Sequence, residues 1–282
     1  MSEDQAKHIL EQWSESAIYW EKHASIVRTM FAPITPALIQ AAGIDQSHSV
    51  LDVAGGVGEP ALTIAEIIGE TGSVIFSDAI SQMALAAKRE AQRRALVNIE
   101  FCQCLADSLP FRKHSFDAVV CRLGVMLFPE PRDAMREMLR VLKPKGLFAA
   151  AVWASSKANP FFQVVSDVVS RYVESPPEDP DAPGAFRFAE PGKLARLLAD
   201  VGASDVTERL FEFDLEAPIT PREFWQLRAQ LSDTLRAKLA QLSPDQLGRI
   251  ADEVEESGRM FFAEGRMSFP AQVLIVAGAA NG

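Results

Sequence analysis

The stretch VLDVAGGVGEPA at residues 50–61 decides the fold class. An apolar run typical of a buried strand leads into Gly55, Gly56 and Gly58, and Pro60 then suits the first position of a helix. Glycine adopts positive φ values and lets a ligand approach the main chain closely. A tight turn between strand and helix is the simpler alternative. The density of glycines favours a strand–loop–helix unit whose backbone contacts a ligand.

Residues 49–153 alternate short apolar runs with longer stretches of helical pattern. Near-continuous apolar strands separated by helices indicate a parallel sheet that is covered on both faces. The apolar runs are SVLDVA (49–54), SVIFSD (73–78), IEFCQC (99–104), FDAVVC (116–121) and LFAAAVW (147–153). We therefore expect an α/β core over residues 43–153.

The segments on either side of this core have other patterns. Residues 1–42 predict helices, because apolar side chains recur at spacings of three and four. Residues 154–282 predict the second half of the sheet with inserted helices. The expected parts of this second half are a helix at 158–174, a Pro-rich loop at 175–185, a helix at 190–203, a strand at 206–216, helices across 220–262 opened in part by Ser243 or Pro244, and a last strand at 269–277.

Composition excludes several classes of function. The net charge of −10, with no basic cluster, argues against a nucleic-acid partner. No apolar run reaches the roughly 20 residues that span a bilayer, so we expect no membrane insertion. Three cysteines, an odd number, suit a reducing compartment. We expect a cytoplasmic protein, either a monomer or a homodimer, that acts on a small molecule.

Two cofactors compete for the glycine turn. The spacing of Gly56, Gly58 and Ala61 satisfies the dinucleotide fingerprint, and Asp78 lies twenty residues past Gly58, where a ribose-binding acid belongs. NAD therefore remains an alternative on these features. Asp52 favours S-adenosylmethionine, because an acid before the turn would repel a pyrophosphate, whereas this cofactor is cationic and has no phosphate.

The motif set resembles class I S-adenosylmethionine-dependent methyltransferases, and closely the ubiquinone/menaquinone (UbiE/COQ5-like) family. The matching segments are VLDVAGGVG (50–58), Asp78 with Met83 after it, ADSLPF (106–111), FDAVV (116–120) and EMLRVLKPKG (137–146). The resemblance implies a Rossmann-like, doubly wound, seven-stranded sheet whose last strand is antiparallel. It also implies a helical N-terminal lid and a helical insertion before the last strand.

The resemblance further implies roles for single residues. The first set would hold the methionine moiety: Asp52 near its charged end, with Ala54, Gly56 and Gly58 along it. The second set would hold adenosine: Asp78 the ribose hydroxyls, Met83 the adenine face, Ala106 and Asp107 the adenine edge. Met83 is also explained as an ordinary core residue. Leu105 departs from the family, which often has Asp or Asn at this place.

The acceptor should lie beyond the strand at 116–121. Arg122 there is expected to hold the carboxylate of the cofactor or an acid of the substrate, or else to form a surface ion pair. His23 is the candidate general base, with Tyr19 and Trp20 as an aromatic wall around the substrate, although His23 is also explained as a packing residue. Cys102 and Cys104 predict no metal site, because a third ligand is lacking.

The expected reaction is methyl transfer from S-adenosylmethionine to a small, apolar or aromatic acceptor of quinone, phenol or polyketide type. Phe- and Leu-rich segments within 220–262 should form its cover. The alternative is a protein that binds S-adenosylmethionine without transferring methyl groups, as a scaffold or for other chemistry. An NAD-dependent oxidoreductase is the third hypothesis.

Overall fold

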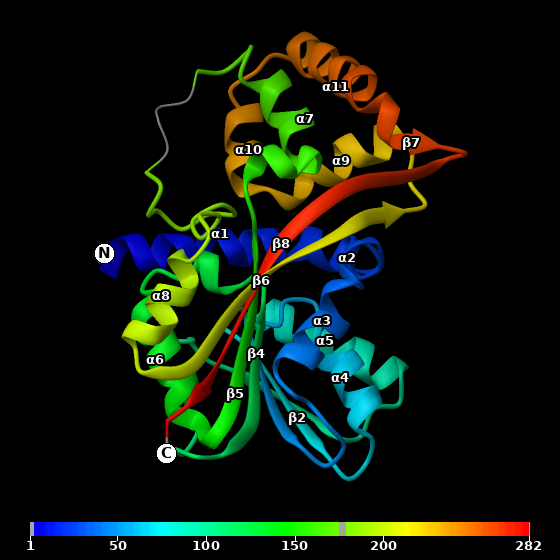
Figure 1. Cartoon of the computed structure of the whole chain (residues 1–282). Coiled ribbons are helices and arrows are strands. Elements are labelled where there is room, and N and C mark those ends of the chain that lie inside the picture. The colour runs from blue at the N-terminus through cyan, green and yellow to red at the C-terminus, as the bar shows by residue number, and fades with distance from the viewer. Residues whose placement is uncertain (1–2, 175–178, 282) are drawn as a thin grey trace.

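A computed structural model describes residues 3–174 and 179–281, and the side chains from residue 7 onward within them. Part of the Pro-rich loop expected at 175–185 therefore lies outside the described residues. One twisted sheet runs through the molecule, with helices on both faces and a group of helices at one end (Figure 1).

The sheet has the strand order β3-β2-β1-β4-β5-β8-β6. The strands β1 to β5 pair in parallel, whereas β8 is antiparallel to both β5 and β6. Their bounds are β1 Ser49–Val53, β2 Ser73–Asp78, β3 Ile99–Gln103, β4 Phe116–Arg122, β5 Leu142–Trp153, β6 Ala203–Ala217 and β8 Arg266–Ala280. The expected Rossmann-like sheet with an antiparallel last strand is confirmed. One detail was missed: the two-residue strand β7 (Phe262–Ala263) pairs with the start of β8.

Helices cover the two faces of the sheet. Figure 1 shows α3, α4 and α5 on one side, and α6 and α8 on the other. Their bounds are α3 Ile34–Ala41, α4 Ala61–Ile68, α5 Ser81–Arg93, α6 Pro131–Val141 and α8 Lys193–Asp200. Each turns an apolar stripe to the sheet, and β1 and β4 are buried between the two layers. This burial explains why both strands read as continuous apolar runs.

A second group of helices lies where β6 and β8 extend beyond the other strands (Figure 1). Its helices are α7 Pro160–Val169, α9 Pro221–Leu231, α10 Asp233–Leu239 and α11 Pro244–Gly258. The helix start expected at Ser243 or Pro244 is confirmed: Ser243 caps α11, and it forms a capping box with Gln246. Phe269 of β8 is fully buried against Phe161 and Phe224, so this group has an aromatic core of its own.

The N-terminal segment divides into two parts. Helix α1 (Glu3–Lys22) lies between the sheet and the second group of helices (Figure 1), and it contacts α5, α9 and α10. Helix α2 (Ala24–Phe31) and α3 belong to the main core, because Met30, Ile34 and Leu38 are fully buried there. Only α1 therefore has the position of a lid.

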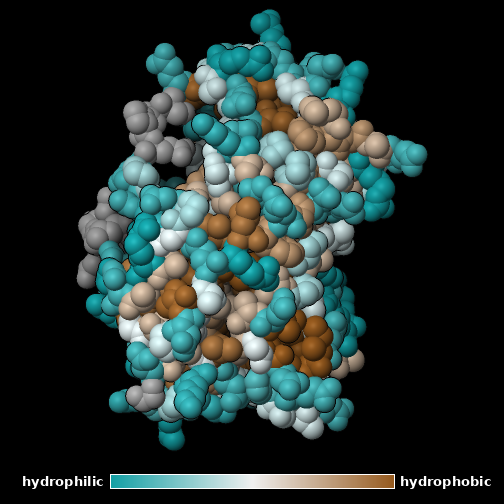
Figure 2. Space-filling view, viewed as in Figure 1, coloured by the Kyte–Doolittle hydropathy of each residue, from teal (hydrophilic) through white to brown (hydrophobic). Residues whose placement is uncertain are grey.

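The surface is mixed in character. Figure 2 shows polar side chains over most of one face, with apolar side chains in separate patches. Within the described residues, no helix has the length and apolar character needed to cross a membrane.

Candidate functional site

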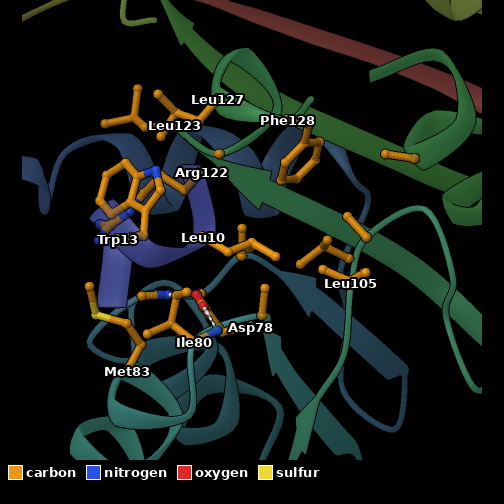
Figure 3. Close-up of a pocket in the computed structure, with 18 of the residues that line it drawn as sticks. Leu10, Trp13, Asp78, Ile80, Met83, Leu105, Arg122, Leu123, Leu127 and Phe128 are labelled. Atoms are coloured by element: carbon orange, nitrogen blue, oxygen red, sulfur yellow. Dashed lines mark hydrogen bonds between the residues drawn. The ribbon is translucent and has the colours of Figure 1, made fainter. Parts of the chain in front are cut away.

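A cavity of about 390 Å³ opens at the carboxyl ends of β1, β2 and β4. Ligands of open α/β sheets bind at this edge, where the loops after neighbouring strands diverge. The volume falls within the range of small-molecule sites, roughly 300–1,000 Å³. Its wall comes from the glycine turn, the end of β2, the loops after β3 and β4, and helices α1 and α2 (Figure 3).

The glycine turn forms the floor of the cavity. Ala54 and Gly56 both line it, with φ values of 58° and 56°. A Cβ on Gly56 would meet nothing within 4 Å, so this backbone faces open space. Gly58, at a φ of 117°, does not line the cavity, and a Cβ there would lie 2.5 Å from Leu62. Gly56 thus leaves room for a ligand, and Gly58 allows close packing on α4.

Asp78 ends β2 beside this turn. Its Oδ2 accepts the backbone N–H of Gly56 at 2.9 Å, and its Oδ1 accepts that of Ile80 at 2.9 Å. The side chain lines the cavity although the residue is only 8% exposed, and burial raises the pKa of the carboxyl to about 6. A carboxylate has about four acceptor sites, so each oxygen keeps capacity for a ribose hydroxyl.

Two further acids surround the turn. Asp52 is fully buried beneath it and does not line the cavity: Oδ2 accepts the Ala61 N–H at 3.1 Å, and Oδ1 has no hydrogen-bond partner. Burial raises the pKa of Asp52 well above its ordinary value. Glu59 lines the cavity and pairs with Arg94 at 2.8 Å and Arg28 at 3.5 Å. Glu59 is thus paired with two arginines and Asp52 is buried away from the cavity, so of these three acids Asp78 is the one whose charge a ligand in the cavity meets.

The expected adenine side of the cavity is apolar. Ile80, Met83 and Leu105 line it, together with Ala106 and Asp107. Met83 is 3% exposed and also belongs to a hydrophobic cluster with Ala17, Val57, Ile80 and Ala86. Met83 therefore packs in the core and also borders the cavity, and its contact with adenine stays a prediction.

The opposite side of the cavity follows β4. Leu123, Leu127 and Phe128 lie together there, and Phe31 of α2 adds a ring (Figure 3 labels the first three). Leu123 has a φ of 59°, a strained value for a branched residue, of the kind that clusters at functional sites. This half of the cavity is an apolar compartment, and we call these four residues the acceptor wall.

Arg122 is the cation of this half. Its Nη1 donates to the carbonyl of Phe31 at 3.2 Å and to Thr35 Oγ1 at 3.3 Å, and burial lowers its pKa. These bonds join the end of β4 to α2 and α3. Its Nε and Nη2 are not engaged by any described hydrogen bond and remain available to a ligand acid.

Helix α1 closes the cavity from above. Leu10 and Trp13 project into it (Figure 3), and Trp20 lines it beside Trp13, with ring centroids 5.9 Å apart. The indole Nε1 of Trp20 is buried without a hydrogen-bond partner. Sequence reasoning proposed Trp20 but missed Leu10 and Trp13. Leu10 and Trp13 are three residues apart, and Trp13 and Trp20 are seven apart, which puts all three on one face of the helix. This spacing in the sequence could have identified Leu10 and Trp13.

His23 and Tyr19 lie outside the cavity wall. His23 Nε2 is 2.7 Å from Gln230 Oε1 of α9, and the Arg236 guanidinium of α10 lies 4.9 Å from the Tyr19 ring centroid. Ser16 accepts from Arg236 at 2.7 Å. Among the described residues, none after Ala134 lines the cavity. The inserted helices thus hold α1 in place from behind.

The described residues contain no group of three or more His, Cys, Asp or Glu side chains suited to a metal ion. Cys104 borders the cavity and Cys102 lies beside it, and burial raises the pKa of the Cys104 thiol to about 12. A neutral thiol is a poor metal ligand and a poor nucleophile.

The part of the chain that forms most of the cavity is similar to a known protein family. Residues 35–173 match the ubiE/COQ5 methyltransferase family. Over this segment, about half of its length, the chain is similar to that family. The match begins at α3, includes all strands that border the cavity, and ends just after α7. The prediction of a class I methyltransferase that depends on S-adenosylmethionine is thus confirmed at the level of the family.

The curated relatives resemble this chain over part of their length. The chain is 37% identical over 109 residues to the ubiquinone/menaquinone biosynthesis C-methyltransferase of Pseudoalteromonas translucida, covering 38% of this chain and 43% of the relative. It is 26% identical over 182 residues to the Erwinia tasmaniensis enzyme of the same name, covering 60% of this chain and 71% of that one. The chain thus spans about half the length of several relatives it matches.

Solved structures show the same fold at low identity. The YcgJ protein of Bacillus subtilis has a TM-score of 0.57 at 21% identity, covering 88% of this chain and 98% of that one. Phosphoethanolamine N-methyltransferase 2 of Haemonchus contortus, solved with S-adenosyl-L-methionine, has a TM-score of 0.55 at 15% identity, covering 93% and 57%. The [4+2]-cyclase SpnF has a TM-score of 0.53 at 21% identity, covering 89% and 81%.

Proposed function

We propose that this chain transfers a methyl group from S-adenosyl-L-methionine to a small, apolar or aromatic acceptor of quinone, phenol or polyketide type. One observation carries the proposal: a single cavity has the Gly56–Asp78 floor on one side and the acceptor wall on the other. The net charge of −10 supports a small molecule over a nucleic acid. The free cysteines at 102, 104 and 121 support a cytoplasmic location.

The residues that line the cavity have different proposed roles, which follow from their chemistry. When bound, S-adenosylmethionine supplies the activated methyl group, and the protein mainly aligns the nucleophile. Asp78 and the Gly56 backbone would hold the adenosine and methionine parts. The acceptor wall would orient an apolar body, and Trp13 and Leu10 would exclude water.

The acceptor should supply an acidic proton of its own. Among the described residues that line the cavity there is no histidine, and the titratable side chains are Glu59, Asp78, Cys104, Asp107, Arg122 and Glu130. Glu59 and Asp78 are committed to the turn. A phenol or a carbon acid ionises most readily of the candidate acceptors, and the Arg122 guanidinium would stabilise the resulting anion.

The proposal is tested by binding and by transfer. Calorimetry should show binding of S-adenosylhomocysteine and no binding of NADH. Incubation with methyl-labelled S-adenosylmethionine and a cell extract should yield a labelled small molecule, whose structure identifies the acceptor. Tight NADH binding without thioether binding would overturn the cofactor, and a label found only in nucleic acid would overturn the acceptor class.

A second candidate is a protein that binds S-adenosylmethionine without methyl transfer. The lack of a histidine in the described cavity wall favours it, and so does structural likeness to a chain named as a [4+2]-cyclase. Under this alternative, S-adenosylhomocysteine binds as strongly, but no label leaves the cofactor with any extract fraction.

A further inference from the structure

Arg122 is a cation of the cavity with which no acid in the described part of the chain forms an ion pair. Of the described residues that line the cavity, it is the single lysine or arginine. The acids whose charges favour its own are Glu59 and Asp52. Glu59 pairs instead with Arg94 at 2.8 Å and Arg28 at 3.5 Å, and Asp52 accepts a backbone N–H at the start of α4. An anion that pairs with Arg122 would therefore come from a ligand.

Three N–H groups of Arg122 are open to the cavity. A guanidinium has five N–H donors, and the two on Nη1 donate to the carbonyl of Phe31 and to Thr35 Oγ1. The Nε–H and both N–H groups of Nη2 have no partner among the described residues. Arg28 and Arg228 each have an Nε that is enclosed without a hydrogen bond, but no nitrogen of Arg122 is in this state. Its free donors are therefore accessible in the cavity that the side chain lines.

The existing contacts of Arg122 fix the orientation of its guanidinium. Nη1 is held by α2 and α3, and the guanidinium carbon lies 5.9 Å from the ring centroid of Phe31, which belongs to the acceptor wall. Figure 3 shows Arg122 on the side of Leu123 and Leu127, with Asp78 on the other side of the cavity. The free edge formed by Nε and Nη2 is thus preorganised for a ligand in the acceptor half.

We propose that Arg122 binds the acceptor through a carboxylate that has a hydroxyl on the neighbouring carbon. The inference rests on the proposed function and narrows its substrate class to aromatic or apolar acids of this kind. The Nε–H and one N–H of Nη2 form a planar fork that matches the two carboxylate oxygens. The second N–H of Nη2 is left for the neighbouring oxygen, whose ionised form it stabilises.

The test uses matched probes on the full chain saturated with S-adenosylhomocysteine. The probe 3-hydroxy-2-naphthoate has the acid beside the hydroxyl, 6-hydroxy-2-naphthoate has the two groups on different rings, and 2-naphthol lacks the acid. By calorimetry, the first probe should bind at least about tenfold more tightly than 2-naphthol and about threefold more tightly than its isomer. A tenfold ratio corresponds to about 1.4 kcal/mol, which one charge-assisted hydrogen bond supplies.

Arg122→Met should reduce both ratios to near one. Arg122→Lys should keep part of the preference for the acid, because it retains the charge without the fork. Each ratio compares probes within one variant, so a general loss of packing in the cavity cancels. Arg222→Met is the matched control, since it makes the same change at an exposed ion pair outside the cavity and should leave both ratios unchanged. If circular dichroism shows that Arg122→Met does not fold, Arg122→Lys decides the test.

The carboxylate of the cofactor is the rival partner of Arg122. S-adenosylhomocysteine has this carboxylate, whereas methylthioadenosine lacks it. Because the acceptor is the proposed partner, Arg122→Met should change the ratio of the affinities for these two nucleosides by less than about threefold. A loss of about tenfold or more for S-adenosylhomocysteine alone would assign Arg122 to the cofactor and overturn the inference.

Three results with the naphthalene probes would also overturn it: no preference for the acid in the unmodified protein, a preference that survives in Arg122→Met, or equal binding of the two hydroxynaphthoates. Binding of S-adenosylhomocysteine is measured first in every variant. Its absence in the unmodified protein would contradict the proposed function and not this inference, and the probe ratios would then be measured on the chain without the nucleoside.

Discussion

The Oδ2 atom of Asp78 accepts the backbone N–H of Gly56 at 2.9 Å and so joins the end of β2 to the turn after β1. The residue proposed to bind the ribose therefore also shapes the turn proposed to bind the methionine moiety. The parallel pairing of β1 with β2, from Ser49 with Ser73 to Val53 with Ser77, brings the two strand ends together. Changes at Asp78 should affect both the ligand and the local fold.

We expect Asp78→Ala to weaken binding of S-adenosylhomocysteine by about 1.5–3 kcal/mol, because charge-assisted hydrogen bonds to the ribose are lost. The free energy of unfolding should fall by roughly 1–3 kcal/mol, since the N–H groups of Gly56 and Ile80 lose their acceptor. Calorimetry and urea denaturation measure the two effects. Asp133→Ala, at an exposed ion pair, is the control. An unchanged dissociation constant would remove Asp78 from the site.

Cofactor binding should depend on pH through Asp78. Burial raises its pKa from 3.8 to about 6, so between these values the folded protein binds a proton that the unfolded chain lacks. This group's contribution to the free energy of unfolding therefore falls as the pH rises through that window. Ribose hydroxyls need the ionised form, so affinity for S-adenosylhomocysteine should rise with pH up to about 6 and then level off.

Calorimetry just below pH 6, in two buffers of different ionisation enthalpy, should show proton release on binding. Asp78→Asn is the matched control: it keeps the shape of the side chain and should abolish both the release and the pH dependence assigned to this group. If the affinity of Asp78→Asn for S-adenosylhomocysteine depended on pH as strongly as that of the unmodified protein, another acid, such as the buried Asp52, would be the group that titrates.

Removal of residues 1–22 should leave a folded protein that binds S-adenosylhomocysteine weakly and turns over at least about a hundredfold more slowly, because Trp13 no longer excludes water. Few residues of α1 are fully buried, whereas removal of residues 1–30 would also delete Val27 and Met30 from the core. Circular dichroism should therefore separate the two truncations. A fully active 23–282 protein would make α1 a packing element only.

Helix α1 and the helices at 220–262 should become more protected together when ligand binds. Ser16, His23 and their partners on α9 and α10 link the two segments, so ordering of one should be transmitted to the other. Hydrogen exchange with and without S-adenosylhomocysteine measures this. The slowing should be absent from α8, none of whose residues lines the cavity. Equal exchange with and without ligand in α1 and in the helices at 220–262 would contradict a lid.

His23→Ala should change turnover by less than about threefold, because the ring contacts Gln230 and does not line the cavity. Loss of a general base costs about 10²–10⁴-fold, so the experiment separates a base from a contact between helices. Gln230→Ala should have the same small effect. A hundredfold loss confined to His23→Ala, with a flattened pH–rate profile, would identify His23 as the base.

The proximity of the proposed cofactor residues could be predicted from sequence, because these residues lie at the ends of successive strands. In a parallel sheet these ends meet at one edge, so Gly56, Asp78 and Arg122 had to approach each other. The positions of these three residues at the ends of successive strands therefore determined that they lie close together. The apolar runs likewise determined the order of buried strands and helices, and the family resemblance supplied the antiparallel last strand.

The acceptor half depended on tertiary structure. Tyr19, Trp20 and His23 are close in sequence, yet only Trp20 lines the cavity. Successive helical residues point about 100° apart, so the orientation of the helix decides which side chain faces the cavity. That orientation is fixed by the contacts of α1 with α5, α9 and α10. The inserted helices were expected to cover the substrate, but they bury their aromatic side chains in a core of their own around Phe269. Local pattern determines which side chains are apolar, and long-range packing decides which cavity they face.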